Sequence, residues 1–148
     1  MKFPEWLPVF GDRSFRGRCP SEEVEQINFF AELKYGHPDL ARLAIHPKNE
    51  GNRNWIRQQM DAKKGEINTG ASDVIIPGAP AMVAELKRQD HTRSRWQDGQ
   101  IDYLETARDA GCFVFVGLGC AGMIAGVEAY LQFLSTLRER ENSGGQNG

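Results

Sequence analysis

The sequence predicts an α/β fold in which a small mixed β-sheet lies between layers of helices. Two short apolar runs, at residues 73–76 and 82–87, flank a turn rich in Pro and Gly and are expected to form a hairpin. A fully apolar run at 112–117 is typical of a central parallel strand. Segments with helical spacing of apolar residues precede and follow these strands.

The first part of the chain predicts an arm followed by a helix. Residues 1–20 are rich in Pro and Arg without periodicity, and are expected to form an extended arm or irregular cap. Ser21 is a suitable N-cap, and the acids that follow it favour a helix to about Lys34. Glu22 shares a helical face with Phe29 and Leu33, so we expect it to be buried.

A buried carboxylate needs a partner or a metal ion. This favours Glu22 over Glu23 and Glu25 as an additional metal ligand or as an organiser of a site. The alternative is that Glu22 is a first-turn charge that interacts with the helix dipole.

The remaining elements follow in order along the chain. We expect a short strand at 40–46 and a helix at 54–64 that ends at Gly65. The hairpin comes next, followed by a polar loop at 89–95, a helix at 96–110 and the apolar strand. A last helix is expected at 121–140. The predicted organisation is an N-terminal arm (1–20), one domain (21–140) and a disordered tail (141–148).

Composition is ordinary for a soluble globular domain. The chain has 148 residues, of which 40% are hydrophobic and 26% are charged. We expect no long apolar span and therefore no membrane protein. Any disulfide would leave one of the three cysteines unpaired, and the spacing of the cysteines does not suit a metal site. We therefore expect the protein to reside in a reducing cytoplasm. The net charge of −2 is unlike that of most nucleic-acid-binding domains, which are basic.

Three charged residues of the hairpin predict a catalytic site. Asp73 heads the first strand, and Glu85 and Lys87 occupy alternate positions of the second, so they share a face. Two carboxylates can hold Mg²⁺, which polarises a phosphate and lowers the pKa of a bound water, while Lys87 orients that water. An isolated Glu-x-Lys can also be a charge pair on a surface strand.

The order of these motifs resembles the PD-(D/E)XK nuclease superfamily, and most closely its VRR-NUC branch in the small phage-encoded form. The resemblance covers roughly residues 21–134 and depends on five features: Glu22 with Gln26, the segment 49–53, Asp73, Glu85-x-Lys87, and Gln100 to Leu104 with Gly111 before a strand. Three positions depart from the family pattern: Ser72 replaces Pro, Glu50 replaces Gly and Gln97 replaces Ser. None of them removes a metal ligand.

The resemblance implies a restriction-endonuclease-like three-layer core and a metal-dependent deoxyribonuclease. It implies Mg²⁺ or Mn²⁺ held by Asp73, Glu85 and Glu22, and catalytic roles for Asp73, Glu85, Lys87 and Gln100. It also implies a homodimer that cuts branched DNA such as four-way junctions, encoded by a phage or prophage and active in the cytoplasm of a bacterial host.

Basic residues near the motifs are candidates for DNA contacts. One group follows Glu85 along the chain and a second precedes Asp73, and both could hold phosphates. The DNA-binding residues that we predict from them are Asn49, Arg53, Lys64, Arg88, Arg93 and Arg95. Solvated loop and helix faces are the alternative interpretation.

Two other function classes fit part of the sequence. Residues 117–122 match the GxGxxG pattern of dinucleotide-binding proteins, although no second strand follows to hold the ribose, and a tight strand-to-helix turn explains them more simply. A non-catalytic DNA-binding or phage accessory protein on the same fold is the second alternative. His37, His46 and His91 lack the spacing of metal ligands.

Overall fold

One mixed sheet of four strands forms the centre of the protein. The computed structural model describes residues 1–47, 60, 63–65 and 70–145. The strand order is β1-β4-β3-β2, where β4 is parallel to both β1 and β3, and β2 is antiparallel to β3. The strands are β1 (Val9–Phe10), β2 (Val74–Ile76), β3 (Met82–Lys87) and β4 (Phe113–Leu118).

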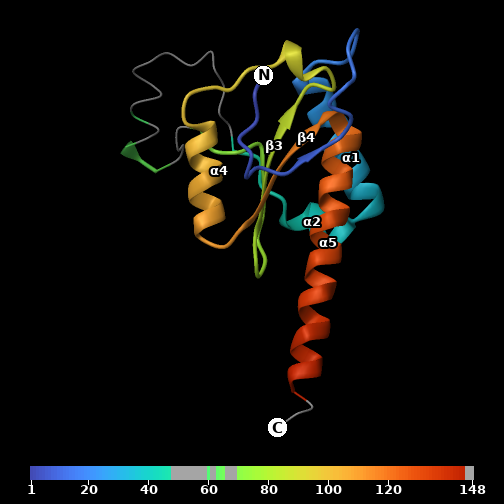
Figure 1. The fold of residues 1–148 in the computed structure, drawn as a ribbon, viewed down its shortest axis with the longest axis vertical. Helices are drawn as coiled ribbons and strands as arrows, with labels where there is room; N and C mark the ends of the chain where they lie inside the picture. Colours follow the sequence, from blue (N-terminus) through green and yellow to red (C-terminus); the bar gives the residue numbers. More distant parts are fainter. Residues whose placement is uncertain (48–59, 61–62, 66–69, 146–148) are drawn as a thin grey trace.

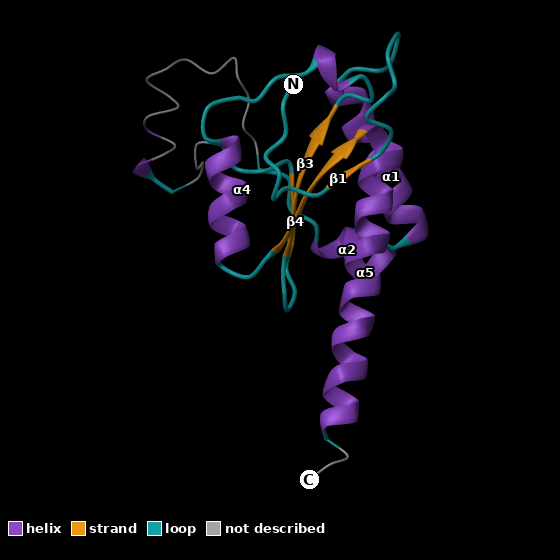
Figure 2. Cartoon of the chain, in the orientation of Figure 1, coloured by secondary structure: helices purple, strands orange, loops and turns teal. Residues whose placement is uncertain are grey.

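Helices cover both faces of this sheet. Figures 1 and 2 show α4 on one side of the strands and α1 with α5 on the other, which makes three layers. The predicted α/β class, with a small mixed sheet flanked by helices, is confirmed. The helices whose bounds the structure describes are α1 (Glu22–Gly36), α2 (Pro38–Leu43), the 3-10 helix η1 (His91–Arg93), α4 (Gln100–Asp109) and α5 (Gly119–Gly144).

The alternation of side chains along β3 divides the core into two layers. Met82, Ala84 and Leu86 pack in an apolar cluster with side chains of α1 and α5. Val83 points the other way and packs with Leu104 of α4. Glu85 and Lys87 follow Val83 at alternate positions, so their side chains point to the same face as Val83. The polar residues of β3 therefore lie on the face that α4 covers.

Glycines allow α5 to pack closely against β4. A Cβ atom at Gly117 would lie 2.6 Å from the backbone nitrogen of Met123, and one at Gly126 would overlap the Phe115 ring. Gly119 has φ +69°, the left-handed conformation that turns the chain from the strand into the helix. The tight strand-to-helix turn that we expected at 117–122 is confirmed.

Several other elements agree with the sequence predictions, and others do not. The α1 helix with its Ser21 cap, the hairpin and the parallel strand β4 are confirmed. The strand expected at 40–46 is wrong, because residues 38–43 form α2 and only Ile45 pairs with the sheet, through Ile75. α4 begins at Gln100 instead of 96. α5 continues through Gly144, into the stretch where we expected a disordered tail.

The arm is more ordered than we expected, because residues 9–10 form the edge strand β1 and Leu7 is buried. Most of the helix expected at 54–64 lies outside the described residues, although Met60 and Lys63 are helical. The division of the chain at residues 20 and 140 stays a prediction.

By length and mean hydropathy α5 could cross a membrane, so the expectation that the chain has no long apolar span is wrong by this measure. Its apolar composition has another explanation, because Met123, Val127 and Tyr130 are buried against the sheet and α1. The second half of α5 extends beyond the sheet (Figure 1).

Candidate functional site

The hairpin places Asp73 and Glu85 side by side. Val74 of β2 pairs with Ala84 of β3, and the same register extended by one residue sets Asp73 opposite Glu85. Asp73 is fixed by its surroundings: its Oδ2 accepts a hydrogen bond of 2.8 Å from the Leu86 N–H, and its carbonyl accepts one of 2.6 Å from the His46 ring. Two carboxylates therefore meet at the point where β2 begins.

A buried network connects Glu85, Lys87 and Gln100. The Gln100 amide donates to Glu85 Oε1 at 2.7 Å, and its own Oε1 accepts from Lys87 Nζ at 2.9 Å. Lys87 Nζ lies 3.5 Å from Glu85 Oε1 and also donates to the Arg95 carbonyl at 3.0 Å. Glu85 and Lys87 are each 1% exposed. Gln100 thus holds the acid and the lysine in a fixed relation.

Close approach of two loops brings Gln100 to this position. A Cβ atom at Gly70 would lie 2.6 Å from the Gln100 backbone nitrogen. Gly70 and Gly99 both have positive φ, which glycine adopts without strain. The start of α4 can therefore reach the loop that leads to Asp73.

The charges of the site are not balanced within the described part of the chain. Among the described residues, Glu85 Oε2 is buried and has no hydrogen-bond partner. Burial raises the pKa of Glu85 well above its usual range, the nearby Asp73 carboxylate raises this pKa further, and Lys87 offsets part of the effect. Two adjacent carboxylates with an unpaired buried oxygen require either a proton or a cation.

This donor set fits a divalent metal ion. Carboxylate oxygens suit Mg²⁺ and Mn²⁺, and Mg²⁺ in particular keeps several waters and binds few protein groups. The described residues contain no cluster of three His, Cys, Asp or Glu side chains that could hold a metal. The fit therefore depends on the pair Asp73 and Glu85.

Glu22 lies at the border of the site. Its Oε1 accepts a hydrogen bond of 2.6 Å from Ser94 Oγ, and its charge contributes to the raised pKa of Glu85. Glu22 is half-buried, whereas Glu25 is the buried acid of α1. The expectation that Glu22 is the acid on the buried face of this helix is therefore wrong. The buried stripe of α1 runs through Glu25, Phe29 and Leu33, which are four residues apart.

The candidate DNA-binding residues occupy different surroundings. Arg93 and Arg95 are exposed, and Arg93 pairs with Asp90 at 3.4 Å. The Arg88 guanidinium donates to the carbonyls of Cys19 and Pro20, and these bonds hold the end of the arm against the segment after β3. Lys64 is exposed. Asn49 and Arg53 lie outside the described residues, and DNA binding by all six stays a prediction.

Trp96 contributes to the site in a way that the sequence did not show. Its ring lies 5.2 Å from Lys87 Nζ, and its indole N–H donates to the Lys2 carbonyl at 2.8 Å. The Phe3 ring contacts Trp96 edge to face, with centroids 6.1 Å apart. The arm therefore helps to hold the Trp96 ring beside Lys87. The only sequence signal was an aromatic residue at the end of a basic run.

The turn at 117–122 has different chemistry. Glu25 Oε2 accepts a hydrogen bond from the Cys120 N–H at the first turn of α5. Burial, with the nearby Glu32 and Glu25 carboxylates, raises the pKa of the Cys120 thiol to about 12, so this thiol is not a nucleophile near neutral pH. A carboxylate of the protein thus occupies the place where a dinucleotide phosphate would bind a helix N-terminus.

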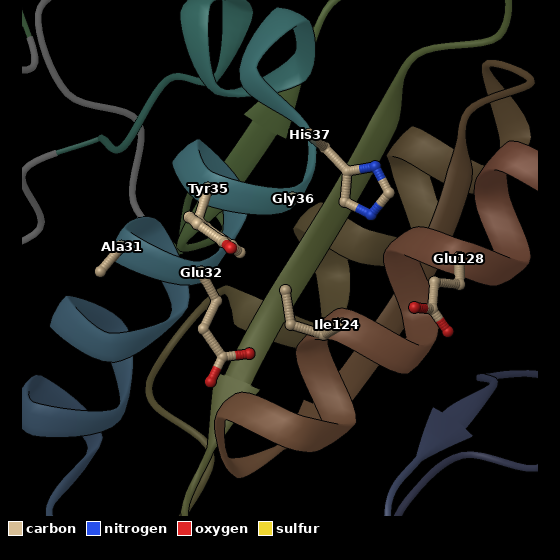
Figure 3. Close-up of a pocket in the computed structure, with 7 residues that line it drawn as sticks. All are labelled: Ala31, Glu32, Tyr35, Gly36, His37, Ile124 and Glu128. Atoms are coloured by element: carbon tan, nitrogen blue, oxygen red, sulfur yellow. The ribbon is translucent and has the colours of Figure 1, made fainter.

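A pocket of about 450 Å³ lies between α1 and α5, away from Asp73, Glu85 and Lys87. Figure 3 shows that its lining comes from the second half of α1, from His37 and from Ile124 and Glu128 of α5. It is therefore separate from the site described above.

Comparison with known proteins finds a structural likeness. A solved structure described as a VRR_NUC domain protein matches this chain with a TM-score of 0.61 and 18% sequence identity, covering 80% of this chain and 92% of that one. At this identity the likeness shows the fold, and it agrees with the three-layer α/β core. No family model matches the sequence, and no curated protein matches it.

Proposed function

We propose that this protein is a metal-dependent nuclease that hydrolyses phosphodiester bonds in DNA. The observation that carries the proposal is the buried Glu85 Oε2 beside Asp73, which has no hydrogen-bond partner among the described residues, with Lys87 on the same face of the sheet. The shared fold with a protein described as a VRR_NUC domain protein supports the same function class.

Each residue of the site has a role in this proposal. Asp73 and Glu85 would hold Mg²⁺ or Mn²⁺, with Glu22 at the border of the site. The ion would polarise the scissile phosphate and lower the pKa of the attacking water. Gln100 engages Glu85 Oε1, which leaves Oε2 for the cation. The positive charge of Lys87 stabilises negative charge that develops on the phosphate.

The finer parts of the proposal follow from the sequence resemblance. We expect a structure-specific endonuclease that acts as a homodimer on branched DNA such as four-way junctions. A single domain of this size covers little DNA, so a second copy would extend the contact. We expect it to act in the cytoplasm of a bacterial host as a phage or prophage product.

The test is cleavage of a labelled panel of linear duplex, single strand, flap and four-way junction with Mg²⁺ or Mn²⁺. Wild-type protein should cut at least one substrate only when the metal is present. Asp73→Ala and Lys87→Ala should both lose cleavage, while Asp73→Ala still binds DNA. Cleavage that persists in EDTA, or in Asp73→Ala, would exclude this mechanism.

One observation favours a second candidate, a non-catalytic DNA-binding or accessory protein. Lys87 is 1% exposed, and its ammonium group contacts Gln100, Arg95 and Glu85, as in a structural ion pair. This candidate predicts that the wild-type protein binds DNA but cuts no member of the panel with either cation.

A further inference from the structure

Positive charge is concentrated in two segments that are far apart in the sequence. Residues 1–20 and 88–96 together contain seven Lys and Arg residues and three acids, in a chain whose net charge is −2. The rest of the chain is therefore acidic. Figure 1 shows the arm and η1 at the same end of the sheet, the end toward which β3 points.

Specific contacts fasten the arm to the 88–96 segment. The Gly17 N–H donates to Asp90 Oδ2 at 2.9 Å, and Arg88 donates to the Cys19 carbonyl at 2.7 Å. At the start of the arm, the Phe3 ring packs edge to face against His91, with centroids 5.2 Å apart. Asp90 and His91 are buried at this junction. The two segments therefore form one surface.

The arginines of the arm are exposed, and contacts place two of them near that surface. Arg13, Arg16 and Arg18 are all exposed. The Arg13 guanidinium lies 5.2 Å from the centroid of the Phe3 ring, and Arg16 donates to the carbonyls of Arg13 and Phe15. The charge of Arg16 also helps to lower the pKa of His91, after the larger effect of burial, so Arg16 lies close to the 88–96 segment.

The same surface adjoins the candidate catalytic site. Arg95 is exposed, yet its carbonyl accepts the hydrogen bond from Lys87 Nζ. Ser94 donates to Glu22 at the border of the site. The 93–95 part of this surface therefore lies next to Lys87 and Glu22.

We propose that Arg13, Arg16 and Arg18, together with Arg93 and Arg95, form a binding surface for the phosphate backbone of DNA. We name these five residues the arm surface. Several exposed guanidinium groups on one surface suit a repeating polyanion, because each group can bind a phosphate without reading the base sequence. This inference rests on the proposed nuclease function for the identity of the polyanion.

The experiment measures binding of a labelled 30-bp duplex, a length chosen as about three helical turns, by fluorescence anisotropy in EDTA at several salt concentrations. The test variant of the full chain is Arg13→Gln/Arg16→Gln/Arg18→Gln. The matched control, Lys34→Gln/Arg138→Gln/Arg140→Gln, removes the same charge from exposed residues of α1 and α5. A second arm variant, Arg13→Lys/Arg16→Lys/Arg18→Lys, keeps the charge. Circular dichroism verifies that each variant folds.

The arm Gln variant should bind at least tenfold more weakly at about 0.1 M salt, and its slope of log K against log salt should fall by roughly 3, because each lost phosphate contact removes about 0.9. The control and the Lys variant should bind much as wild type does. Equal binding by the arm Gln variant and wild type, or equal losses in the arm and control variants, would overturn the proposal. So would loss of binding in the Lys variant.

Two further results separate this inference from the proposed function. Arm-dependent DNA binding without cleavage would contradict the nuclease proposal and leave the arm surface intact. Cleavage by the arm Gln variant with unchanged KM would contradict the arm surface and leave the nuclease intact. Arm-dependent binding to phosphatidylserine vesicles, with none to DNA, would overturn the assignment of the polyanion.

Discussion

Glu25 and Glu85 are both buried carboxylates, but their surroundings differ. Glu25 is 7% exposed and accepts a hydrogen bond from the Cys120 N–H, at the positive end of α5. Glu85 is 1% exposed, faces the Asp73 carboxylate and, among the described residues, has an oxygen without a partner. The protein thus gives Glu25 a hydrogen-bond donor, whereas one oxygen of Glu85 has no partner within the described part of the chain.

This difference separates a structural motif from a candidate catalytic one. The Glu25 contact completes the first turn of α5, so it belongs to the packing of the fold. An uncompensated carboxylate lowers stability unless a ligand removes the penalty, and such groups are common at functional sites. The Glu-x-Lys motif and the GxGxxG pattern both suggested function in the sequence, and only the first contains such a group.

The largest effect is expected from exchanging each glutamate for its amide. Glu85→Gln should lower metal-dependent cleavage about a thousandfold, because it removes the charged oxygen proposed to hold the cation. Its melting temperature should not fall, since the like charge beside Asp73 is lost. Glu25→Gln keeps an acceptor for the Cys120 N–H, so cleavage should stay near the wild-type rate. Steady-state cleavage and thermal unfolding of both variants measure this contrast.

A smaller loss is expected when the residue that orients Glu85 is changed. Gln100→Met should lower kcat by about tenfold to a hundredfold, because Glu85 and Lys87 lose the amide that fixes their relative positions. Tyr103→Phe, in the same helix, is the matched control and should change kcat little. Equal kcat values for Gln100→Met and wild type would show that the bridge has no catalytic role.

Asp90 extends the comparison to a third buried carboxylate. Hydrogen bonds from the Thr92 hydroxyl and the Gly17 N–H hold its pKa well below its usual range. The unfolded chain therefore binds the proton more tightly, so this stabilisation is present above about pH 3.9 and is lost as the pH falls through the folded-state pKa.

Asp90→Asn should therefore melt several degrees below wild type at pH 7, and the difference should shrink below about pH 4. Thermal unfolding by circular dichroism between these pH values measures this effect. Glu105→Gln, at an exposed position of α4, should show no such pH-dependent difference. A gap between Asp90→Asn and wild type that stays constant with pH would contradict the assignment.

The smallest effect is expected at the turn from β4 into α5. Millimolar NAD⁺ or NADP⁺ should not change the melting temperature, because Glu25 already occupies the α5 N-terminus. A clear rise would mean that residues 117–122 bind a pyrophosphate, and it would remove the distinction between the two motifs.

Much of the secondary structure could be predicted, because the sequence patterns that determine it are local. The Ser21 cap predicted α1, and the alternation of residues 82–87 predicted that Glu85 and Lys87 share a face. The apolar run at 112–117 predicted a central parallel strand. These features depend on neighbours along the chain, so a single sequence contains them.

Features that depend on distant partners could not be predicted. The segment 40–46 is too short for its apolar pattern to distinguish a helix from a strand. Pro38 lies at the first position of α2, where proline suits a helix start. Burial of Glu25 requires the Cys120 N–H from the other end of the chain. Likewise, Trp96 gains its position from Lys2 and Phe3, which lie far away in the sequence.

The most direct test of the central claim is Mn²⁺ binding to the metal-free protein, measured by electron paramagnetic resonance without DNA. Wild type and Glu25→Gln should bind Mn²⁺ with the same affinity, and Glu85→Gln should bind it at least tenfold more weakly. Equal Mn²⁺ affinity in Glu85→Gln and wild type, or no binding by wild type, would contradict a cation site at Asp73 and Glu85.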